Sequence, residues 1–414
     1  MSASNENRFD IVIAGGGMIG SSLALALAPL GLRVAIVEPV PRGVEAQPSF
    51  DDRSTALSRS TQRMFEAMGI WDQVVAASMP ITQVHVSDRG RFGFSHIDAA
   101  EQGVEALGYV VINRVLGQVL QDALGSVENL DLLCPARVIA ADCGPDAAMV
   151  TVENDGTPQR LNCGLLVAAD GANSSVRDLA GIGFSRISYE QRAVIGNLLP
   201  EIPIRNRAFE RFTSQGPLAM LPVADGRAGF VWVVSEQDAE RVIALDDASF
   251  ITELQQTFGN RLGELSRVGK RSSYPLSLTR AVRLTGKRVV LVGNAAHGLH
   301  PAAAQGFNLG LRDVAALADC LADARLAGDG TFDPGDQSIL DRYSAWRRAD
   351  QSKLVRFTDG LVRLFGDARE PVAGLRNIGM LAFDLVPGVR RTFAKHTMGL
   401  AGRLPRLSRG LPLS

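Results

Sequence analysis

Three glycines near the N-terminus, Gly15, Gly17 and Gly20, have the G-x-G-x-x-G spacing that binds the pyrophosphate of a dinucleotide. The first permits a tight turn, the second lets the pyrophosphate approach the backbone, and the third lets a helix pack closely on a strand. That helix would present free N–H groups and partial positive charge to the phosphates. Glu38 is placed to accept hydrogen bonds from ribose hydroxyls. The pattern predicts a dinucleotide site without separating FAD from NAD.

A strand, a helix and a second strand must surround these glycines if they are to bind phosphate. Residues 9–14 are β-branched and almost free of polar groups, which indicates a strand buried on both faces. A helix is expected over residues 19–30, ending near Gly31, and a second strand over residues 34–37. The uncharged run 11–32 has the length of a membrane span, but its glycines and the acidic residues before it favour a strand and helix. We therefore expect neither a signal peptide nor a transmembrane helix.

Two later segments repeat the pattern of a buried strand followed at once by a polar turn. Residues 165–169 lead into Asp170-Gly171 and on to Arg177, and residues 288–292 lead into Gly293-Asn294. Each has an ordinary interpretation when taken alone, because Asp-Gly is a common turn, an isolated arginine is commonly a surface residue, and an asparagine often caps a strand end. Their conjunction with the glycine motif favours a cofactor site.

In order and separation, these three motifs resemble those of the FAD-dependent aromatic-ring hydroxylases, and the resemblance covers essentially the whole chain. It implies an α/β fold in which a discontinuous Rossmann-like FAD-binding domain carries an inserted, sheet-rich substrate domain. Apolar residues on one helical face also predict a C-terminal helical segment. The expected ranges are 1–79, 106–181 and 286–340 for the FAD-binding domain, 80–105 and 182–285 for the substrate domain, and 341–414 for the helical segment.

The resemblance also implies which residues bind the cofactor. Asp170 and Arg177 would brace the pyrophosphate side of FAD and the route of the nicotinamide cofactor, and the helix beginning at Gly306 would direct its positive end at the flavin. Asn294 replaces the family's usual aspartate at the ribityl hydroxyls, which keeps hydrogen bonding but loses a negative charge. The expected cofactor-binding residues are Gly15, Gly17, Gly20, Glu38, Arg53, Arg114, Asp170, Arg177, Gly293, Asn294, Pro301, Gly306, Phe307 and Asn308.

Within this family the chain most resembles the ubiquinone-biosynthesis hydroxylases. Residues 51–58, 84–90, 210–219 and 305–313 carry that resemblance, and residues 84–90 together with Asn294 point to the branch that acts on 2-polyprenyl-6-methoxyphenol. The resemblance implies a lipophilic phenol substrate, NADPH or NADH as reductant, and O2 as co-substrate. The alternatives are a sister enzyme that oxidises another ring carbon, an FAD oxidase or dehydrogenase without oxygen insertion, and a non-catalytic flavin-binding subunit.

Catalytic side chains are harder to identify from the sequence. His297 and His300 are candidates because they follow the Gly293-Asn294 motif, although structural roles are the favoured interpretation. They lie three residues apart without a third ligand nearby, and the 4 cysteines form no C-x-x-C pair, so we expect no metal site. The net charge of −1 over 414 residues gives no indication of a nucleic-acid partner.

The C-terminal residues carry a cluster of positive charge. After Asp384 there are no acidic residues, whereas basic residues follow at Arg390, Arg391, Lys395, Arg403, Arg406 and Arg409. Leucines interleave with the last three arginines, so a helix there would be amphipathic, although Pro405 and Pro412 oppose one continuous helix. Two interpretations are open. The tail is solvated and its arginines pair with nearby carboxylates, or it holds a cytoplasmic enzyme at the inner membrane surface or in a ubiquinone-biosynthesis complex.

Overall fold

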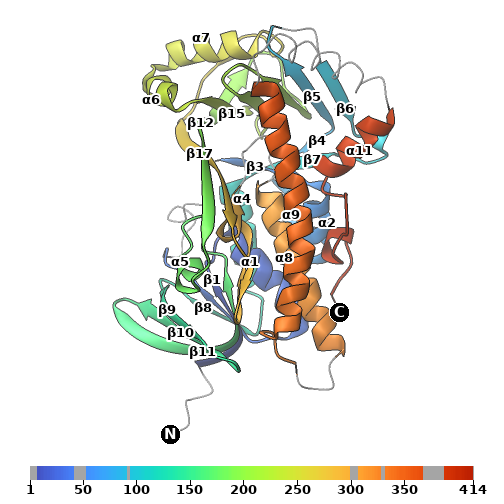
Figure 1. Ribbon diagram of the computed structural model, residues 1–414. Helices are drawn as coiled ribbons and strands as arrows, with labels where there is room; N and C mark the ends of the chain where they lie inside the picture. Colours follow the sequence, from blue (N-terminus) through green and yellow to red (C-terminus); the bar gives the residue numbers. More distant parts are fainter. Residues whose placement is uncertain are drawn as a thin grey trace.

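The computed structural model describes residues 7–41, 53–90, 94–298, 306–327, 332–366 and 387–413, with the backbone alone described for 353–366. Two large sheets lie one above the other in Figure 1, with a small sheet between them and the long helices α8 and α9 alongside. This arrangement confirms the expected α/β class.

The lower sheet is the parallel sheet that the glycine motif requires. Strands β19, β11, β1, β2 and β8 run parallel in that order. The apolar residues of β19, β1 and β2 are buried on both faces, as in other covered parallel sheets, whereas the edge strand β8 is partly exposed. Strand β18 pairs with β19, and β9 and β10 extend β11 into an antiparallel hairpin. The bounds are β1 Arg8–Ala14, β2 Val34–Val37, β8 Leu130–Leu133, β9 Arg137–Cys143, β10 Ala148–Asn154, β11 Thr157–Ala168, β18 Thr285–Gly286 and β19 Val289–Leu291.

Helices cover this sheet and continue its loops. The expected first helix is confirmed as α1, Met18–Leu27, followed by the 3₁₀ turn η2, Ala28–Leu30. Gly31 ends it at a φ of 62°, a conformation that favours glycine. The other bounds are α4 Asn113–Leu124, α5 Ser175–Leu179, η4 Gly293–Ala295 and α8 Gly306–Ala327.

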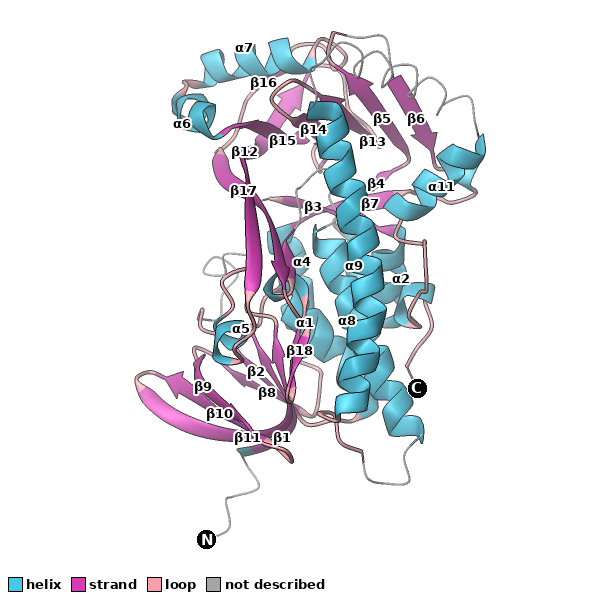
Figure 2. Ribbon diagram, in the orientation of Figure 1, coloured by secondary structure: helices cyan, strands magenta, loops and turns pink. Residues whose placement is uncertain are grey.

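The upper sheet is mostly antiparallel, in the order β20, β17, β12, β15, β14, β13, β5, β6, with β16 beside β12. Helices α6 and α7 pack over one of its faces (Figure 2), where aromatic residues such as Phe230 and Phe250 form a separate apolar core. The bounds are β5 Gln83–Asp88, β6 Phe94–Asp98, η3 Ala100–Gln102, β12 Phe184–Pro200, β13 Arg207–Phe212, β14 Pro217–Pro222, β15 Ala228–Ser235, α6 Glu236–Ala244, α7 Asp247–Phe258, β16 Leu265–Ser266, β17 Ser272–Ala281 and β20 His297–Gly298.

A small sheet of β3 (Ser54–Ser58), β7 (Gly108–Ile112) and β4 (Ser78–Ile81) lies at the junction. Helices α2 (Arg59–Ala67) and α3 (Trp71–Ala76) connect β3 to β4 along the chain. We keep the division into FAD-binding and substrate domains as a proposal. The strands are distributed compatibly with it, except that β20 belongs to the upper sheet.

The C-terminal residues follow the body of the protein. Helix α9, Gln337–Gly366, runs beside α8, and later come α11, Pro387–Thr397, and η6, Leu407–Arg409. Leu407 and Leu413 are buried in the main core, and Arg406 is hydrogen-bonded to Asp319. Leu407 points inward, and η6 is the only regular turn described between α11 and residue 413. The residues around Leu407 therefore do not form a basic amphipathic helix. No helix in the described ranges is long and apolar enough to cross a membrane.

Candidate cofactor site

Four of the predicted residues lie just after the carboxyl ends of neighbouring parallel strands. Gly15 follows β1, Glu38 follows β2, and Gly293 comes two residues after the end of β19. Asp170 comes two residues after the end of β11. Because the carboxyl ends of parallel strands meet at one edge, the structure brings the three motifs together in the crevice where such sheets bind nucleotides.

The glycine turn has no room for side chains at two of its positions. Gly15 has a φ of +102°, and a Cβ there would lie 2.5 Å from the carbonyl oxygen of Ala169. A Cβ at Gly20 would lie 1.9 Å from the carbonyl oxygen of Gly15. Gly17 is the N-cap of α1, and no side chain caps this helix end. The first-turn N–H groups are therefore left to a ligand, as phosphate binding requires.

The carboxylate of Glu38 is held in place from both sides. Its Oε2 accepts a hydrogen bond from the backbone N–H of Gly16 at 2.6 Å, and its Oε1 accepts one from Val40 at 2.8 Å. The side chain is mostly buried. Each oxygen keeps a second lone pair, so the fixed carboxylate retains the capacity to accept a ribose hydroxyl.

The Asp-Gly motif presents one carboxylate oxygen for which no partner is found. Asp170 Oδ2 accepts from the N–H of Val176 at 3.2 Å, whereas its buried Oδ1 has no hydrogen-bond partner among the described residues. Arg177 is buried and donates to the carbonyl oxygens of Ala172, at 3.1 Å, and Ala295, at 3.2 Å. This guanidinium thus joins the Asp-Gly motif to the turn after β19. Its expected contact with FAD stays a prediction.

The turn after β19 packs directly on α1 and α8. Gly293 has a φ of +59°, and a Cβ on Gly310 of α8 would lie 3.2 Å from its Cα and 2.7 Å from Cδ1 of Ile19. Asn294 is exposed at this turn, and its side chain makes no hydrogen bond to any described residue. The amide is therefore available to a ribityl chain. Sequence reasoning had not singled out Gly310.

Asn308, near the start of α8, has a structural role. Asn308 is buried, its Oδ1 accepts from Ser58 N–H at 2.9 Å and Thr61 Oγ1 at 2.8 Å, and its Nδ2 donates to the carbonyl oxygen of Ala56 at 2.9 Å. The side chain therefore braces α8 against the small sheet and α2. Any contact of this turn with a flavin would come from its backbone. Gly306 and Phe307, the first residues of α8, are partly buried.

Two expected arginines meet at the edge of the small sheet. The backbone N–H of Asn113 donates to the carbonyl oxygen of Arg53 at 2.8 Å, which places Arg53 beside Arg114 in the first turn of α4. The guanidinium of Arg53 lies 4.6 Å from the ring centre of Tyr274 on β17, so it spans the gap to the upper sheet. Pro301 and His300 lie outside the described residues.

His297 belongs to a buried ionic network. Its Nε2 lies 2.6 Å from Asp313 Oδ2, which also accepts from the N–H of Gly293 at 3.0 Å. Arg347 of α9 donates to the other oxygen at 2.7 Å. Burial alone would raise the pKa of Asp313, but His297 and Arg347 lower it to about 2. His297 therefore has a structural partner through Nε2, and the network holds the turn that carries Asn294. Asp313 and Arg347 were missed as site-supporting residues.

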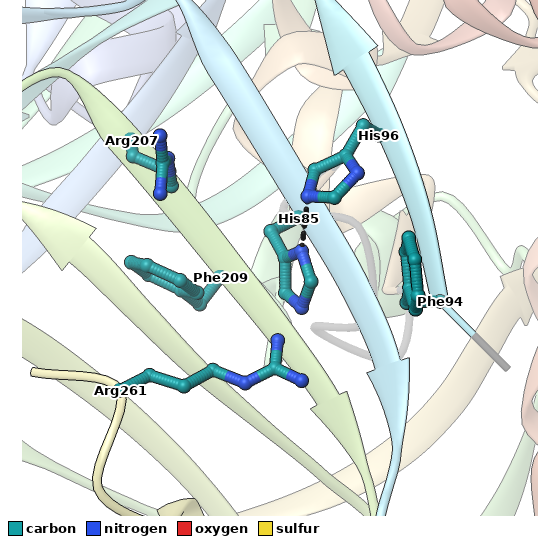
Figure 3. A pocket seen from close by; sticks show the side chains of 6 residues that line it. All are labelled: His85, Phe94, His96, Arg207, Phe209 and Arg261. Atoms are coloured by element: carbon teal, nitrogen blue, oxygen red, sulfur yellow. Dashed lines mark hydrogen bonds between the residues drawn. The ribbon is translucent and has the colours of Figure 1, made fainter. Parts of the chain in front are cut away.

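A pocket of about 320 Å³ lies elsewhere, on one face of the upper sheet (Figure 3). It is lined by His85, Phe94, His96, Arg207, Phe209 and Arg261. His85 Nδ1 lies 2.6 Å from His96 Nε2. Burial, with the nearby arginines, lowers the pKa of His85 to about 3, so its imidazole is neutral. Phe209 contacts Phe258 of α7, so this pocket opens away from the cofactor edge.

The residues at the carboxyl edge fit FAD. FAD would supply hydrogen-bond partners to the uncapped helix end, the glycine turn, the unpartnered oxygen of Asp170 and the exposed amide of Asn294. No group of metal-ligating residues is found in the described part of the chain.

Comparisons with known proteins agree with this geometry. The FAD binding domain family matches residues 8–358 of the chain. The ubiquinone hydroxylase UbiL of Rhodospirillum rubrum is 39% identical over 408 residues, which cover 98% of this chain and 93% of that protein. The 3-demethoxyubiquinol 3-hydroxylase of Escherichia coli is 32% identical, covering 94% of this chain and 98% of the relative.

Solved structures share the fold. The p-nitrophenol 4-monooxygenase PnpA of Pseudomonas putida superposes with a TM-score of 0.79 at 20% identity, covering 96% of this chain and 99% of that one. The protein pqsL of Pseudomonas aeruginosa, described as a probable FAD-dependent monooxygenase, gives a TM-score of 0.75 at 24% identity, covering 91% of this chain and 100% of that one.

Proposed function

Since the chain belongs to the FAD-dependent aromatic hydroxylases, in their ubiquinone-biosynthesis branch, we propose that it hydroxylates the phenol ring of a polyprenylated ubiquinone precursor of the 2-polyprenyl-6-methoxyphenol type. The chain is an FAD-dependent monooxygenase. NADPH or NADH as reductant and O2 as co-substrate are part of the proposal.

The protein would hold FAD along the carboxyl edge of the parallel sheet. Gly15, Gly17 and the N-terminus of α1 would take the pyrophosphate, Glu38 the adenosine ribose, and Asn294 the ribityl chain. Bound FAD supplies the two-electron redox chemistry through which one atom of O2 can enter an aromatic ring. The protein's own contribution is to position the ring and to exclude water.

The observation that carries the substrate class is the chain-long similarity to UbiL together with the character of the upper sheet. The face of that sheet turned toward the small sheet carries mainly apolar, partly exposed residues, among them Ala219, Val231 and Ile195. Such a face suits an apolar ring with a hydrocarbon tail.

A second candidate acts on another carbon of the same ring. The Escherichia coli relative, named as a 3-demethoxyubiquinol 3-hydroxylase, favours it. The two candidates are separated by a deletion strain of the source organism. Accumulation of 2-polyprenyl-6-methoxyphenol supports the first, accumulation of the demethoxy quinol supports the second, and a normal quinone profile contradicts both.

Contact with a membrane or with a biosynthetic complex is also proposed, because a polyprenyl substrate resides in the bilayer. The exposed cations of α11, Arg391 and Lys395, support it better than the residues around η6, which pack on the protein body.

A further inference from the structure

One carboxyl group, Glu210 of β13, lies on the sheet face that is turned toward the cofactor-binding half. Directly paired residues of adjacent strands share a face of a sheet. Glu210 pairs with Val86 of β5 on one side and Ala219 of β14 on the other. The same row continues through Val231 and Ile195 to Ser272.

The next row of this face contacts the small sheet. Gly229 is so close to β3 that a Cβ would lie 3.0 Å from Ser54 Oγ. Ala208, two residues before Glu210, packs in an apolar cluster with Ile81 and Val110 of β4 and β7. The small sheet begins beside Arg53, one of the expected flavin contacts, so Glu210 and the cofactor edge lie on the same side of the upper sheet.

The opposite face is covered by α7 over its apolar core and carries the pocket of Figure 3 at His85 and Phe209. Its corresponding row contains His85, Phe209, Met220 and Phe230, all buried, and Phe230 lies under Phe250 of α7. The row of Glu210 is different, since all six of its residues are partly exposed, from Val86 across to Ser272. This row is apolar and partly exposed on the cofactor side, and it contains one carboxyl group. These are features of a substrate-binding surface.

The carboxyl group of Glu210 makes no hydrogen bond or ion pair with any described residue. Burial raises its pKa to about 7, with no charged neighbour as a cause. Titratable or charged groups elsewhere on this face include Asp88 in the adjacent row, Tyr274 on β17 and Tyr189 on β12, and the guanidinium of Arg53 approaches it over Tyr274. A carboxylate in such surroundings costs stability, and a partner that arrives from outside would offset that cost.

We propose that Glu210 is the group that binds the phenol hydroxyl of the substrate and accepts its proton during hydroxylation. The inference rests on the proposed phenol hydroxylation. The O–H bond of the phenol breaks, the proton moves to a carboxylate oxygen of Glu210, and the electron pair stays on the phenol oxygen. From there it raises the electron density of the ortho and para carbons, where the oxygen atom from O2 enters. The proton is released to solvent when the product leaves.

Three histidines are the other candidate bases. His297 is held through Nε2 by Asp313, and its Nδ1 is buried without a hydrogen-bond partner among the described residues. His85 and His96 line the pocket of Figure 3, and their strand register places them on the sheet face opposite to that of Glu210.

The test uses the FAD-loaded enzyme with 2-allyl-6-methoxyphenol as the probe. Glu210→Gln keeps the shape and the hydrogen bond but removes the base. The matched control is Glu240→Gln, which changes an exposed carboxyl on α6. We expect Glu210→Gln to lower product formation by about 10²–10⁴-fold, the usual contribution of a general base. Probe affinity should change by less than about fivefold, because one neutral hydrogen bond is exchanged for another.

The pH profile separates catalysis from a structural role. Wild-type kcat/KM should fall below a pH of about 7, because Glu210 must be ionised in the free enzyme. Glu210→Gln should lose this limb, and a fluorinated analogue of the probe, whose hydroxyl is more acidic, should recover part of its rate. Equal rates and equal profiles in wild type and Glu210→Gln overturn the inference. If the wild type itself hydroxylates no phenol, it is the proposed function that fails.

Discussion

Nε of Arg347 on α9 lies 2.7 Å from Oδ1 of Asp313 on α8, and both side chains are buried. The other carboxylate oxygen of Asp313 accepts the N–H of Gly293 at 3.0 Å. One carboxylate thus fixes the long C-terminal helix and the turn that carries Asn294.

Replacing Asp313 by Asn tests this relationship. The change leaves the guanidinium of Arg347 buried without its countercharge, so we expect a loss of about 3 kcal/mol or more in unfolding free energy near neutral pH. Chemical denaturation is the measurement. Asp341→Asn, an exposed carboxyl of the same helix as Arg347, is the control.

The same variant gives a defined pH dependence. Because the folded pKa of Asp313 is lowered to about 2 from an ordinary value of 3.8, its stabilisation is present above about pH 4 and is lost as the pH falls toward 2. The stability difference between wild type and Asp313→Asn should therefore shrink over that interval. A difference that stays constant from pH 6 to 2 is incompatible with a charged Asp313.

Gly20→Ala should impair FAD retention. The new Cβ would lie 1.9 Å from the carbonyl oxygen of Gly15, so the turn that holds the pyrophosphate must move. FAD released per protein after gel filtration is the measurement. Gly183→Ala is the control, because its Cβ would meet only Val282 at 3.6 Å. Full FAD occupancy in a folded Gly20→Ala protein contradicts the assignment of the glycine turn.

Asn294 gives a graded prediction. Asn294→Ala should weaken FAD binding by about 1–2 kcal/mol, the loss of hydrogen bonds to a buried polar ligand. Asn294→Asp should be tolerated, since it restores the residue usual at this position in the family. A fluorescence titration in which Asp binds FAD far more weakly than Ala speaks against contact with the ribityl chain.

Contacts between residues close in the sequence could be predicted, whereas contacts between distant elements could not. The strand, turn and helix around Gly15 were predictable because a few adjacent residues determine them. The partners of Asp313 were not, because His297 and Arg347 approach it from other elements, and only the packing of α8 on α9 brings them together. Glu210 lay in a stretch that resembled the family, but the face to which a strand residue points depends on sheet pairing. Of the two interpretations of the tail, an amphipathic helix around Leu407 is not formed, because this side chain packs in the core.

The membrane hypothesis now depends on α11. Deleting residues 386–414 would also remove Leu407 and Leu413 from the core, so substitution is the cleaner test. Replacing both Arg391 and Lys395 by Ser should weaken binding to anionic liposomes by about 1 kcal/mol per residue, measured by sedimentation at low salt. Failure of the unaltered protein to sediment, or equal sedimentation of the variant, rules out this contact.

We propose above all that this flavoprotein inserts one oxygen atom from O2 into a phenol ring. Purified, FAD-loaded protein should be incubated with a short-chain 2-prenyl-6-methoxyphenol, NADPH or NADH, and ¹⁸O2, and the product analysed by mass spectrometry. The expected product is a hydroxylated ring carrying one ¹⁸O atom. Consumption of reduced nicotinamide with release of peroxide and an unchanged phenol would identify an oxidase instead, and would contradict it.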